Sequence, residues 1–530
     1  MHVTPQVNTL YYGDCLEVMR GWGDNWVDEV YLDPPFNSNA DYNIIYGTNS
    51  AGTRTAQVQA FTDTWTWDEA AIARVNALEL DVTHPAHRAV IVLKTALGET
   101  GMLAYTSYMA ERLAEMHRLL KPTGTLWLHC DETASHYLKI ALDLLFGARN
   151  FCNEIVWKKL NSPKPQATFF GVQKDVILVY AKDASQAKFH KAYRAHDEKS
   201  LKSYRYDDND GRGPYRTSAL SNKTALGGFG KMRTWKWRGA TARWIYSFER
   251  MEEMWADGRI HTSRNGLHRK KDYLNESPGI VVSDIWTDSD VNPIQRKEQL
   301  YPTQKPLALL ERVIKAGSDE GDIVLDPFCG CGTTIVAAHK LNRQWIGIDI
   351  SPFVVDIIET QRFGGMKLNT DGIPTDMESA KKLAREKPFH FEAWAVTRIP
   401  GLAANDVKHG DRGIDGRGML VTKPAGAMSN VVLAQVKGGR FQMSHLRDFL
   451  WVLEREKALF GVFITLEPVT SAQAKSELAR LGEITVGASV YPRVQPWSVQ
   501  DYFDGRLPQL PPMNDPYTGK PLRTVLPLGL

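Results

Sequence analysis

The sequence has few cysteines and no long apolar run, and each absence excludes a class of protein. The five cysteines show no paired CxxC spacing, so the sequence predicts neither a structural zinc site nor a disulfide framework. No window approaches the ~18 apolar residues that a membrane span needs, and no basic patch followed by an apolar stretch opens the chain. We therefore expect a cytoplasmic protein with reduced thiols and no membrane partner.

The chain also has little net charge, but that charge is unevenly distributed. The 530 residues sum to +3, whereas residues 182–275 hold 21 Lys and Arg against 11 Asp and Glu. This segment therefore carries +10 and the remainder −7. A local excess of positive charge is typical of a polyanion-binding surface, but ordinary solvated faces also have it. Charge alone therefore leaves nucleic-acid binding open.

Length and apolar periodicity predict an α/β protein of more than one domain. Short apolar runs, expected as strands at 27–32, 125–130 and 175–180, alternate with helical patterns such as 108–120. This alternation is typical of a parallel, doubly wound sheet. The expected divisions are one half of an α/β domain at 1–181, an inserted module at 182–280, the second half at 281–363, a linker at 364–388, a smaller α/β domain at 389–505 and a Pro-rich extended tail at 506–530.

The first chemical motif is Asp33-Pro34-Pro35-Phe36, directly after an expected strand. An exocyclic amine of a nucleobase is a poor nucleophile because its lone pair is delocalised into the ring, so a catalyst must draw on its N–H bonds. Asp33 can accept one N–H and the Pro34 carbonyl the other, since two prolines stiffen the loop. Phe36 offers a stacking face for a base taken out of a duplex. A simple strand-ending turn is the alternative interpretation of these residues.

The second motif is a glycine-containing loop at 326–334, between an expected strand and an expected helix. Gly330 and Gly332 let the backbone approach a ligand closely. Asp349 follows 17 residues after Gly332, at the end of the next strand, where an acid can hold ribose hydroxyls. The loop lacks the third glycine of the dinucleotide fingerprint, which disfavours pyrophosphate binding. Tight turns use glycine in any case, so the motif is weak by itself.

Several ordered blocks make residues 7–362 similar to the permuted (beta-class) amino-group DNA methyltransferases, in which the catalytic motif precedes the glycine motif. Residues 33–36 resemble the catalytic tetrad of that family, and residues 326–333 its glycine loop. The chain departs from the family at Lys174, since His usually precedes the acid that is Asp175 here, and we assign this position no role. The other resembling blocks are 12–18 near the cofactor adenine, 124–129 on the next strand, 301–306 at the methionine end of the cofactor and 347–349 at its ribose.

The resemblance implies a Rossmann-like methyltransferase sheet, S-adenosylmethionine as cofactor and double-stranded DNA as substrate. The insert then lies where the family keeps its target-recognition region, which makes Lys236, Arg238 and Arg243 candidate DNA contacts. The neighbouring tryptophans can either act as a wedge against a DNA strand or form a small local core of the protein. The sequence favours neither interpretation over the other. The residues implied for the cofactor are Asp14, Thr303, Lys305, Asp326, Phe328, Gly330, Gly332, Thr333 and Asp349.

The C-terminal domain holds a second set of polar residues. Glu392 precedes Asp415, and Gln435 and Lys437 follow on one face of an expected strand. This order resembles the Mrr-like branch of the PD-(D/E)xK nucleases, which have a restriction-endonuclease-like α/β fold. The resemblance implies that Asp415 and Gln435 help to place a divalent metal such as Mg²⁺, while Lys437 steadies the attacking water. An inactive domain would keep the same fold and could still bind DNA or a partner.

Three functions are therefore weighed. The leading expectation is an S-adenosylmethionine-dependent DNA methyltransferase that modifies a flipped base, with adenine N6 favoured over cytosine N4 because Asp rather than Ser begins the tetrad. The second is a single-chain restriction-modification enzyme whose C-terminal domain also cleaves DNA. The third is a non-catalytic binding module. The sequence leaves open whether the chain binds a separate restriction subunit and whether it associates with itself.

Overall fold

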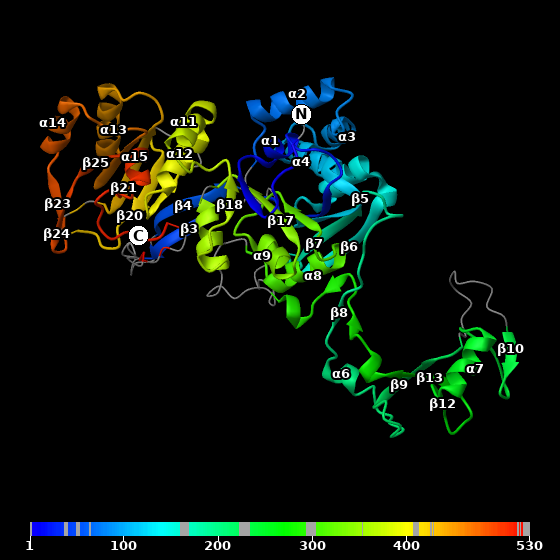
Figure 1. Cartoon of the computed structure of the whole chain (residues 1–530). Coiled ribbons are helices and arrows are strands. Elements are labelled where there is room, and N and C mark those ends of the chain that lie inside the picture. The colour runs from blue at the N-terminus through cyan, green and yellow to red at the C-terminus, as the bar shows by residue number, and fades with distance from the viewer. Residues whose placement is uncertain are drawn as a thin grey trace. The chain divides into compact units, whose positions relative to one another are not determined.

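The computed structural model (Figure 1) divides into two compact units, unit 1 with Met1–His190 and Asp284–Leu530, and unit 2 with Lys191–Ser283. None of the helices in the part of the chain that it describes is long and apolar enough to cross a membrane. The described residues are 3–35, 41–48, 54–62, 65–159, 169–221, 234–292, 304–351, 353–405, 413–424, 427, 429–516, 519 and 521–522.

Unit 1 is built on a nine-stranded sheet with the order β15-β6-β7-β5-β2-β16-β17-β1-β18. Neighbouring strands are parallel, except that β7 runs antiparallel to both β5 and β6. The expectation of a parallel sheet is therefore wrong at β7. The reason is that β6 and β7 follow one another in the chain and are also adjacent in the sheet, as in a hairpin, which requires opposite directions.

The strands of this sheet are β1 (Thr9–Tyr12), β2 (Val27–Leu32), β5 (Leu120–Cys130), β6 (Phe151–Lys158), β7 (Lys174–Ala181), β15 (Ile285–Trp286), β16 (Ile323–Asp326), β17 (Gln344–Asp349) and β18 (Asn369–Asp371). A separate antiparallel hairpin consists of β3 (Asp41–Thr48) and β4 (Arg54–Thr62). The α-helices of this part are α1 (Cys15–Arg20), α2 (Glu69–Leu80), α3 (His87–Leu97), α4 (Gly101–Leu119), α5 (Ser135–Leu142), α8 (Leu307–Gly317), α9 (Thr333–Lys340) and α10 (Phe353–Ile357).

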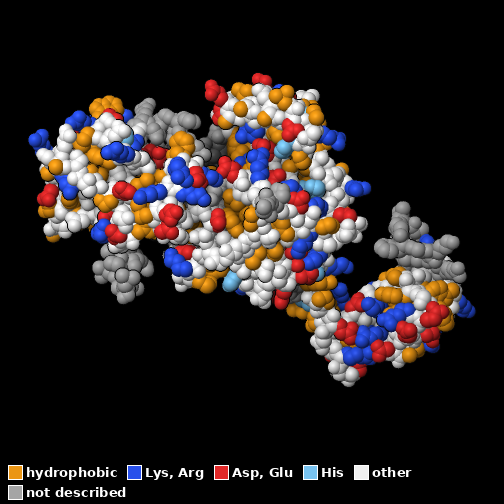
Figure 2. Space-filling model, turned by 45° about the horizontal axis from the view of Figure 1, so that its top comes forward, with side chains coloured by type: hydrophobic (Ala, Val, Ile, Leu, Met, Phe, Trp, Pro, Cys, Tyr) orange, Lys and Arg blue, Asp and Glu red, His pale blue; other side chains and the backbone are white. Residues whose placement is uncertain are grey.

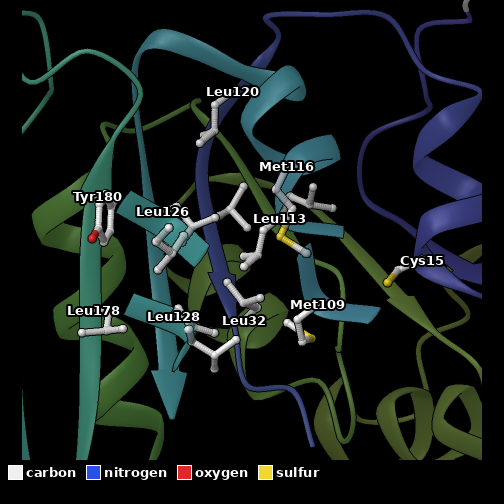
Figure 3. Close-up of a cluster of buried hydrophobic side chains, with 14 of the residues drawn as sticks. Cys15, Leu32, Met109, Leu113, Met116, Leu120, Leu126, Leu128, Leu178 and Tyr180 are labelled. Carbon is white, nitrogen blue, oxygen red and sulfur yellow. The ribbon is translucent and has the colours of Figure 1, made fainter. Parts of the chain in front are cut away.

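A large apolar core holds α4 against the sheet. Met109, Leu113 and Met116 recur at helical spacing on α4 and pack with Leu126 and Leu128 of β5 (Figure 3). All of these side chains are fully buried. Because every residue of β2 is buried as well, the core fixes the position of the strand that precedes Asp33.

The direction of the central strands brings distant loops to one edge of the sheet. β2, β16, β17 and β1 are mutually parallel neighbours, with Asp326 paired to Gly347 and Tyr12 paired to Asp349. The loops that follow these four strands must therefore leave the sheet at its carboxyl edge. In open α/β sheets this edge is where ligands bind.

The stretch expected as a linker holds regular structure. Residues 369–371 form β18, which pairs with β1, and α11 (Met377–Glu386) buries Ala380 in the core of the C-terminal domain. Gly372 has φ +80°, and a Cβ there would lie 2.6 Å from the carbonyl oxygen of Tyr12. Only glycine fits this exit from the edge strand.

The C-terminal domain has a five-stranded mixed sheet with the order β19-β20-β21-β22-β25. Helices α12 and α13 each contact the central strand β21. Met513, in the stretch expected as an extended tail, is buried in this core and bridges to Leu420. The elements are α12 (Pro388–Thr397), β19 (Leu402–Ala404), β20 (Gly416–Met419), β21 (Val431–Lys437), α13 (Met443–Arg455), β22 (Phe460–Thr465), α14 (Ala472–Arg480), β23 (Glu483–Val486), β24 (Ser489–Pro492), β25 (Val494–Ser498) and α15 (Val499–Phe503).

Unit 2 coincides closely with the expected insert and has a small core of its own. Trp237, Trp244, Met251 and Met254 are buried in it. Its elements are β8 (Tyr193–Arg194), α6 (Glu198–Leu201), β9 (Tyr215–Ala219), β10 (Thr234–Trp237), β11 (Ala240–Arg243), α7 (Phe248–Ala256), β12 (Ile260–Thr262), β13 (His268–Tyr273) and β14 (Ile280–Val281).

Candidate active site

A cavity at the carboxyl edge of the nine-stranded sheet collects residues from the loops after β1, β2, β16 and β17. The chain segments that form it are far apart in the sequence, so the fold alone brings them together. Predicted residues that line the cavity are Asp14, Asp33, Pro34, Pro35, Lys305, Asp326, Phe328, Gly330, Thr333 and Asp349. Two other predicted residues, Phe36 and Thr303, lie outside the described residues.

Asp33 is held by a lysine from the segment before α8. Nζ of Lys305 donates to Oδ2 of Asp33, and both side chains are largely buried. The other carboxylate oxygen, Oδ1, is buried and has no hydrogen-bond partner among the described residues. Asp33 therefore offers one oriented acceptor atom, since the ion pair fixes the carboxylate plane.

The glycine loop is shaped by hydrogen bonds to its first residue. The Phe328 amide donates to Oδ1 of Asp326 at 3.0 Å, which turns the chain sharply after β16. Desolvation raises the pKa of Asp326 to about 7, although hydrogen bonds from Thr334 and the Phe328 amide favour the carboxylate. A buried acid with this pKa titrates near neutrality, so the electrostatic potential of the cavity depends on pH.

Gly330 and Gly332 have different roles. At Gly330 (φ +48°) the nearest atom to an added Cβ is 4.0 Å away, so the backbone lies open beside the cavity. At Gly332 (φ +73°) an added Cβ would lie 2.7 Å from Cγ1 of Ile358. Gly332 is not among the described residues that line the cavity, and it acts through packing at the start of α9.

Asp349 at the end of β17 ties this strand to the glycine loop. Its Oδ2 accepts from the Gly330 amide at 2.8 Å and its Oδ1 from the Ser351 amide at 2.8 Å. Desolvation raises the pKa of Asp349 to about 6, although these amides stabilise the carboxylate. The Ile350 amide favours the carboxylate as well, and the two oxygens still have acceptor capacity for a hydroxyl of a ligand.

A buried arginine that the sequence analysis did not single out supports the other side of the cavity. Arg112 Nη2 donates to Oδ2 of Asp14 at 2.6 Å, and the guanidinium stacks on the Tyr108 ring, 3.1 Å from its centroid. Oδ1 of Asp14 accepts from the Leu16 amide at 2.8 Å and so caps α1. The sequence feature that could have identified Arg112 is its position four residues after Tyr108, within an apolar helical stripe.

In unit 2, the tryptophans form the core and two of the predicted cations face outward. The hairpin of β10 and β11 buries Trp237, while Lys236 and Arg243 lie on its opposite, exposed face. No ion pair of either cation is found within the described residues. Arg238, in contrast, pairs with Glu252 at 3.0 Å and stacks 4.2 Å from the ring centroid of Trp255.

Much of the positive charge of unit 2 is paired within the unit. Arg259 bonds Glu276 through two nitrogens, at 2.7 and 2.8 Å, and Arg212 lies 2.8 Å from Asp210. On the face seen in Figure 2, Lys and Arg side chains of unit 2 accordingly lie among Asp and Glu side chains. Lys236 and Arg243, which have no ion pair within the described part of unit 2, are therefore the stronger candidates for contact with an external anion.

The structure places Asp415 beside Gln435, with Lys437 two residues further along the same strand. Asp415 Oδ2 accepts from the Val436 amide at 2.7 Å, which places it beside Gln435 and near Lys437 on β21. Gln435 is 4% exposed and its Oε1 has no partner within the described residues. Glu392 lies half-buried on α12. No cluster of three or more His, Cys, Asp or Glu with metal-ligand geometry occurs where the chain is described.

The mixed sheet defines an α/β protein with a cavity where its central strands end, at the edge where open α/β sheets bind ligands. Residues 27–360 match the family model described as DNA methylase, and the chain belongs to this family. The expected DNA methyltransferase family is thereby confirmed, whereas the permuted class and the Mrr-like C-terminal domain stay predictions. The match ends before the C-terminal domain.

Individual relatives agree with the family. The chain is 31% identical over 264 residues to the type II methyltransferase M.EcaI of Enterobacter cloacae, covering 48% of this chain and 56% of the relative. It is 26% identical over 353 residues to the type III restriction-modification enzyme StyLTI Mod subunit of Salmonella typhimurium. This match covers 64% of the present chain and 50% of the relative. The chain thus spans about half the length of these relatives. The solved M1.HpyAVI complex with SAM is 16% identical to the chain, with a TM-score of 0.29. This match covers 66% of the present chain and 97% of the solved one.

Proposed function

We propose that the chain is a site-specific DNA methyltransferase that transfers the methyl group of S-adenosylmethionine to an exocyclic amino nitrogen of a flipped base. The observation that carries this proposal is that Asp33 and the glycine loop line one cavity. Oδ1 of Asp33 is buried there without a partner in the described part of the chain. A buried acceptor is costly to leave unpaired, and a base N–H would satisfy it.

The residues of the cavity fit S-adenosylmethionine. Asp349 keeps acceptor capacity for ribose hydroxyls, and the open backbone at Gly330 allows close approach. The Asp33 carboxylate supplies negative charge on the side from which the base would enter. When bound, S-adenosylmethionine supplies an electrophilic methyl group on a positively charged sulfur.

The protein's part in the reaction is to orient the amine and to exclude water. Lys305 holds Oδ2 of Asp33, so Oδ1 accepts one amine N–H. The Pro34 carbonyl accepts the second N–H, since the two prolines restrict the loop. These two bonds turn the nitrogen lone pair toward the methyl group.

The proposed base is adenine, modified at N6, because the tetrad begins with Asp33 rather than Ser. Long-read sequencing of DNA from cells that express the protein identifies the modified base and its motif together. Methylated adenine at a defined motif is the expected result. N4-methylcytosine would contradict the base preference, and unmodified DNA would contradict the proposed function.

Asp33→Ala separates an enzyme from a non-catalytic binding module. Transfer of labelled methyl groups to DNA should be lost, while calorimetry should still detect binding of S-adenosylmethionine, because Asp349 and Gly330 are intact. A variant that methylates DNA as well as the wild type would contradict the role of Asp33.

A second candidate function is DNA cleavage by the C-terminal domain. It is favoured by the buried Oε1 of Gln435 beside Asp415, which has no partner among the residues that the structure describes. Two oxygen donors fit Mg²⁺, which usually keeps several waters and takes only one or two carboxylates from a protein. Asp415 and Gln435 would hold the ion. Lys437 would place positive charge beside a scissile phosphate.

Plasmid DNA without the methyl mark, incubated with Mg²⁺, tests this second function. The wild type should convert it to linear or nicked forms, and Asp415→Ala and Lys437→Gln should not. Asp33→Ala is the matched control, because it removes methyl transfer without touching the C-terminal domain. A wild-type protein that leaves the plasmid intact would contradict cleavage.

A further inference from the structure

A line of three buried polar side chains begins at the candidate active site. Tyr31 lines the cavity, and its hydroxyl lies 3.1 Å from Nδ1 of His129. Nε2 of His129 lies 3.3 Å from Oδ2 of Asp175. The exposed fractions of the three residues are 1%, 0% and 4%. A polar line this deeply buried inside an apolar sheet requires an explanation.

The sheet register puts the three side chains on one face. Tyr31 of β2 is opposite Trp127 of β5, His129 is two residues further along β5, and His129 is opposite Ile177 of β7. Asp175 is two residues from Ile177, so the alternation of side chains brings all three to the same side. Asp33 is likewise two residues from Tyr31, and both line the cavity.

The hydrogen bonds define which atom holds each proton. Burial raises the pKa of Tyr31, and the charges of Asp33, Asp326 and Asp175 raise it further, so the hydroxyl stays protonated and donates to Nδ1 of His129. Burial opposes ionisation of Asp175, but hydrogen bonds from His129 and Lys159 and the charge of Lys159 lower its pKa. Neutral His129 then carries its proton on Nε2 and donates it to Asp175.

The far end of the line is held in place by a cation. Nζ of Lys159 donates to Oδ1 of Asp175 at 2.6 Å, and the Lys159 side chain is 30% exposed. Asp175 therefore stays a fixed carboxylate behind His129. A base whose Nδ1 accepts from a tyrosine hydroxyl, with a carboxylate behind its other nitrogen, is well suited to take up that hydroxyl's proton.

Methylation of an amine releases one proton, and the cavity where this would occur meets the buried polar line at Tyr31. We infer that Tyr31, His129 and Asp175 form a relay that takes up this proton, an inference that rests on the methyl-transfer function proposed above. The amine nitrogen forms its bond to the methyl carbon as the carbon–sulfur bond breaks, and that electron pair stays on sulfur. The nitrogen then carries a positive charge and gives one proton to Asp33.

The remaining transfers restore Asp33. Tyr31 and Asp33 line the same cavity, and no described residue bonds Oδ1 of Asp33, so a water in the cavity would carry the proton from Asp33 to the Tyr31 oxygen while the original Tyr31 proton moves to Nδ1 of His129. The products are a neutral methylated amine, an ionised Asp33, a neutral Tyr31 and an imidazolium at His129 that faces the Asp175 carboxylate. Reversal through Tyr31 returns the proton to water once the product has left.

Tyr31→Phe removes the relay and keeps the aromatic wall. In single-turnover assays, with the DNA motif read by sequencing, the rate of methyl transfer should fall about 10- to 100-fold. The affinities for S-adenosylmethionine and DNA should stay unchanged. His129→Gln and Asp175→Asn should lower the rate in the same way, so the test does not depend on one variant.

The pH profile separates a relay from a structural role. A relay that already holds an extra proton cannot accept another, so the wild-type rate should fall at acidic pH more steeply than the rate of Tyr31→Phe. Asp326 and Asp349 titrate in both proteins, and Lys159 pairs with Asp175 in both, so the difference between the two profiles isolates the relay. The solvent deuterium isotope effect should also be smaller in the variant.

The control is Tyr180→Phe, which removes a fully buried hydroxyl on β7 that donates to Asp143 at 2.7 Å, outside the cavity. It should transfer methyl groups at the wild-type rate. If Tyr31→Phe keeps the wild-type rate and pH profile, or loses ligand affinity rather than rate, the relay is overturned and the methyltransferase function stands. A wild type without methyl transfer would overturn both.

Discussion

Lys305 donates a charge-assisted hydrogen bond to Oδ2 of Asp33 from 272 positions away in the sequence. The pair ties the loop after β2 to the segment before α8, and both side chains are largely buried. Charge-assisted bonds of this kind are stronger than neutral ones and fix the direction of the carboxylate. Oδ1, which has no partner among the described residues, owes its position to Lys305.

Lys305→Gln should therefore impair the reaction more than ligand binding. We expect the single-turnover rate of methyl transfer to fall about 10- to 100-fold, because the acceptor atom is no longer oriented. Lys188→Gln is the matched control. Nζ of Lys188 lies 2.6 Å from Oδ2 of Asp322, and this pair is outside the cavity. Equal rates for the two variants would contradict an orienting role of Lys305.

The raised pKa of Asp326 predicts a pH-dependent stability. Its pKa is about 7 in the folded chain against an ordinary 3.8, so between these values the folded state binds more protons than the unfolded state. The contribution of Asp326 to stability therefore falls as pH rises from about 4 to about 7, by up to about 1.4 kcal/mol per pH unit.

Asp326→Asn removes this titration and keeps an oxygen for the Phe328 amide. The free energy of unfolding of the variant, relative to the wild type, should rise as the pH is raised from about 5 to about 8. Urea unfolding at a series of pH values measures it. A difference that does not change with pH would show that Asp326 is not the buried titrating acid.

The two loop glycines should respond differently to alanine. Gly332→Ala places a Cβ on a backbone in the left-handed region and brings that Cβ into close contact with Ile358. We therefore expect a loss of about 1–3 kcal/mol of stability. Gly330→Ala has free space around its Cβ and should cost less stability, but it should weaken binding of S-adenosylmethionine, since the methyl group stands at the open backbone. Urea unfolding and calorimetry measure the two effects. A more stable Gly332→Ala than Gly330→Ala would contradict this assignment.

The sequence was most informative where local pattern and chemistry coincide. The strand Val27–Leu32 has the expected bounds, and Asp33, Asp326 and Asp349 meet in one cavity because each ends a parallel strand. Strand ends can be read from apolar runs, and parallel strands share an edge, so this convergence follows from a local signal.

Features that depend on strand direction, strand register or helix packing could not be predicted from the sequence. The line from Tyr31 to Asp175 exists only because β7 is antiparallel to β5, a direction that the expected parallel sheet excluded. The Arg112–Asp14 pair likewise requires α4 to pack beside α1. β18 has three residues and no periodicity, so its pairing with β1 decides its conformation.

The insert shows why the same residues supported two interpretations. Trp237 and Trp244 alternate with cations, as a DNA wedge would require, yet both are buried in the core of unit 2. Period-two alternation of aromatic and basic residues describes any hairpin with one buried and one solvated face. The sequence therefore identified the hairpin faces without indicating that the cations, rather than the tryptophans, are accessible to an anion.

Lys236 and Arg243 on this solvated face should carry phosphate contacts. Lys236→Gln and Arg243→Gln should each weaken binding to all duplex sequences and lower the slope of log affinity against log salt concentration by about 1. Arg238→Gln is the matched control, because its charge is already paired with Glu252, and it should change the slope less. Fluorescence anisotropy with duplexes over a range of salt concentrations measures the slopes. If Arg238→Gln lowers the slope as much as Lys236→Gln does, pairing within unit 2 does not govern which cations reach DNA.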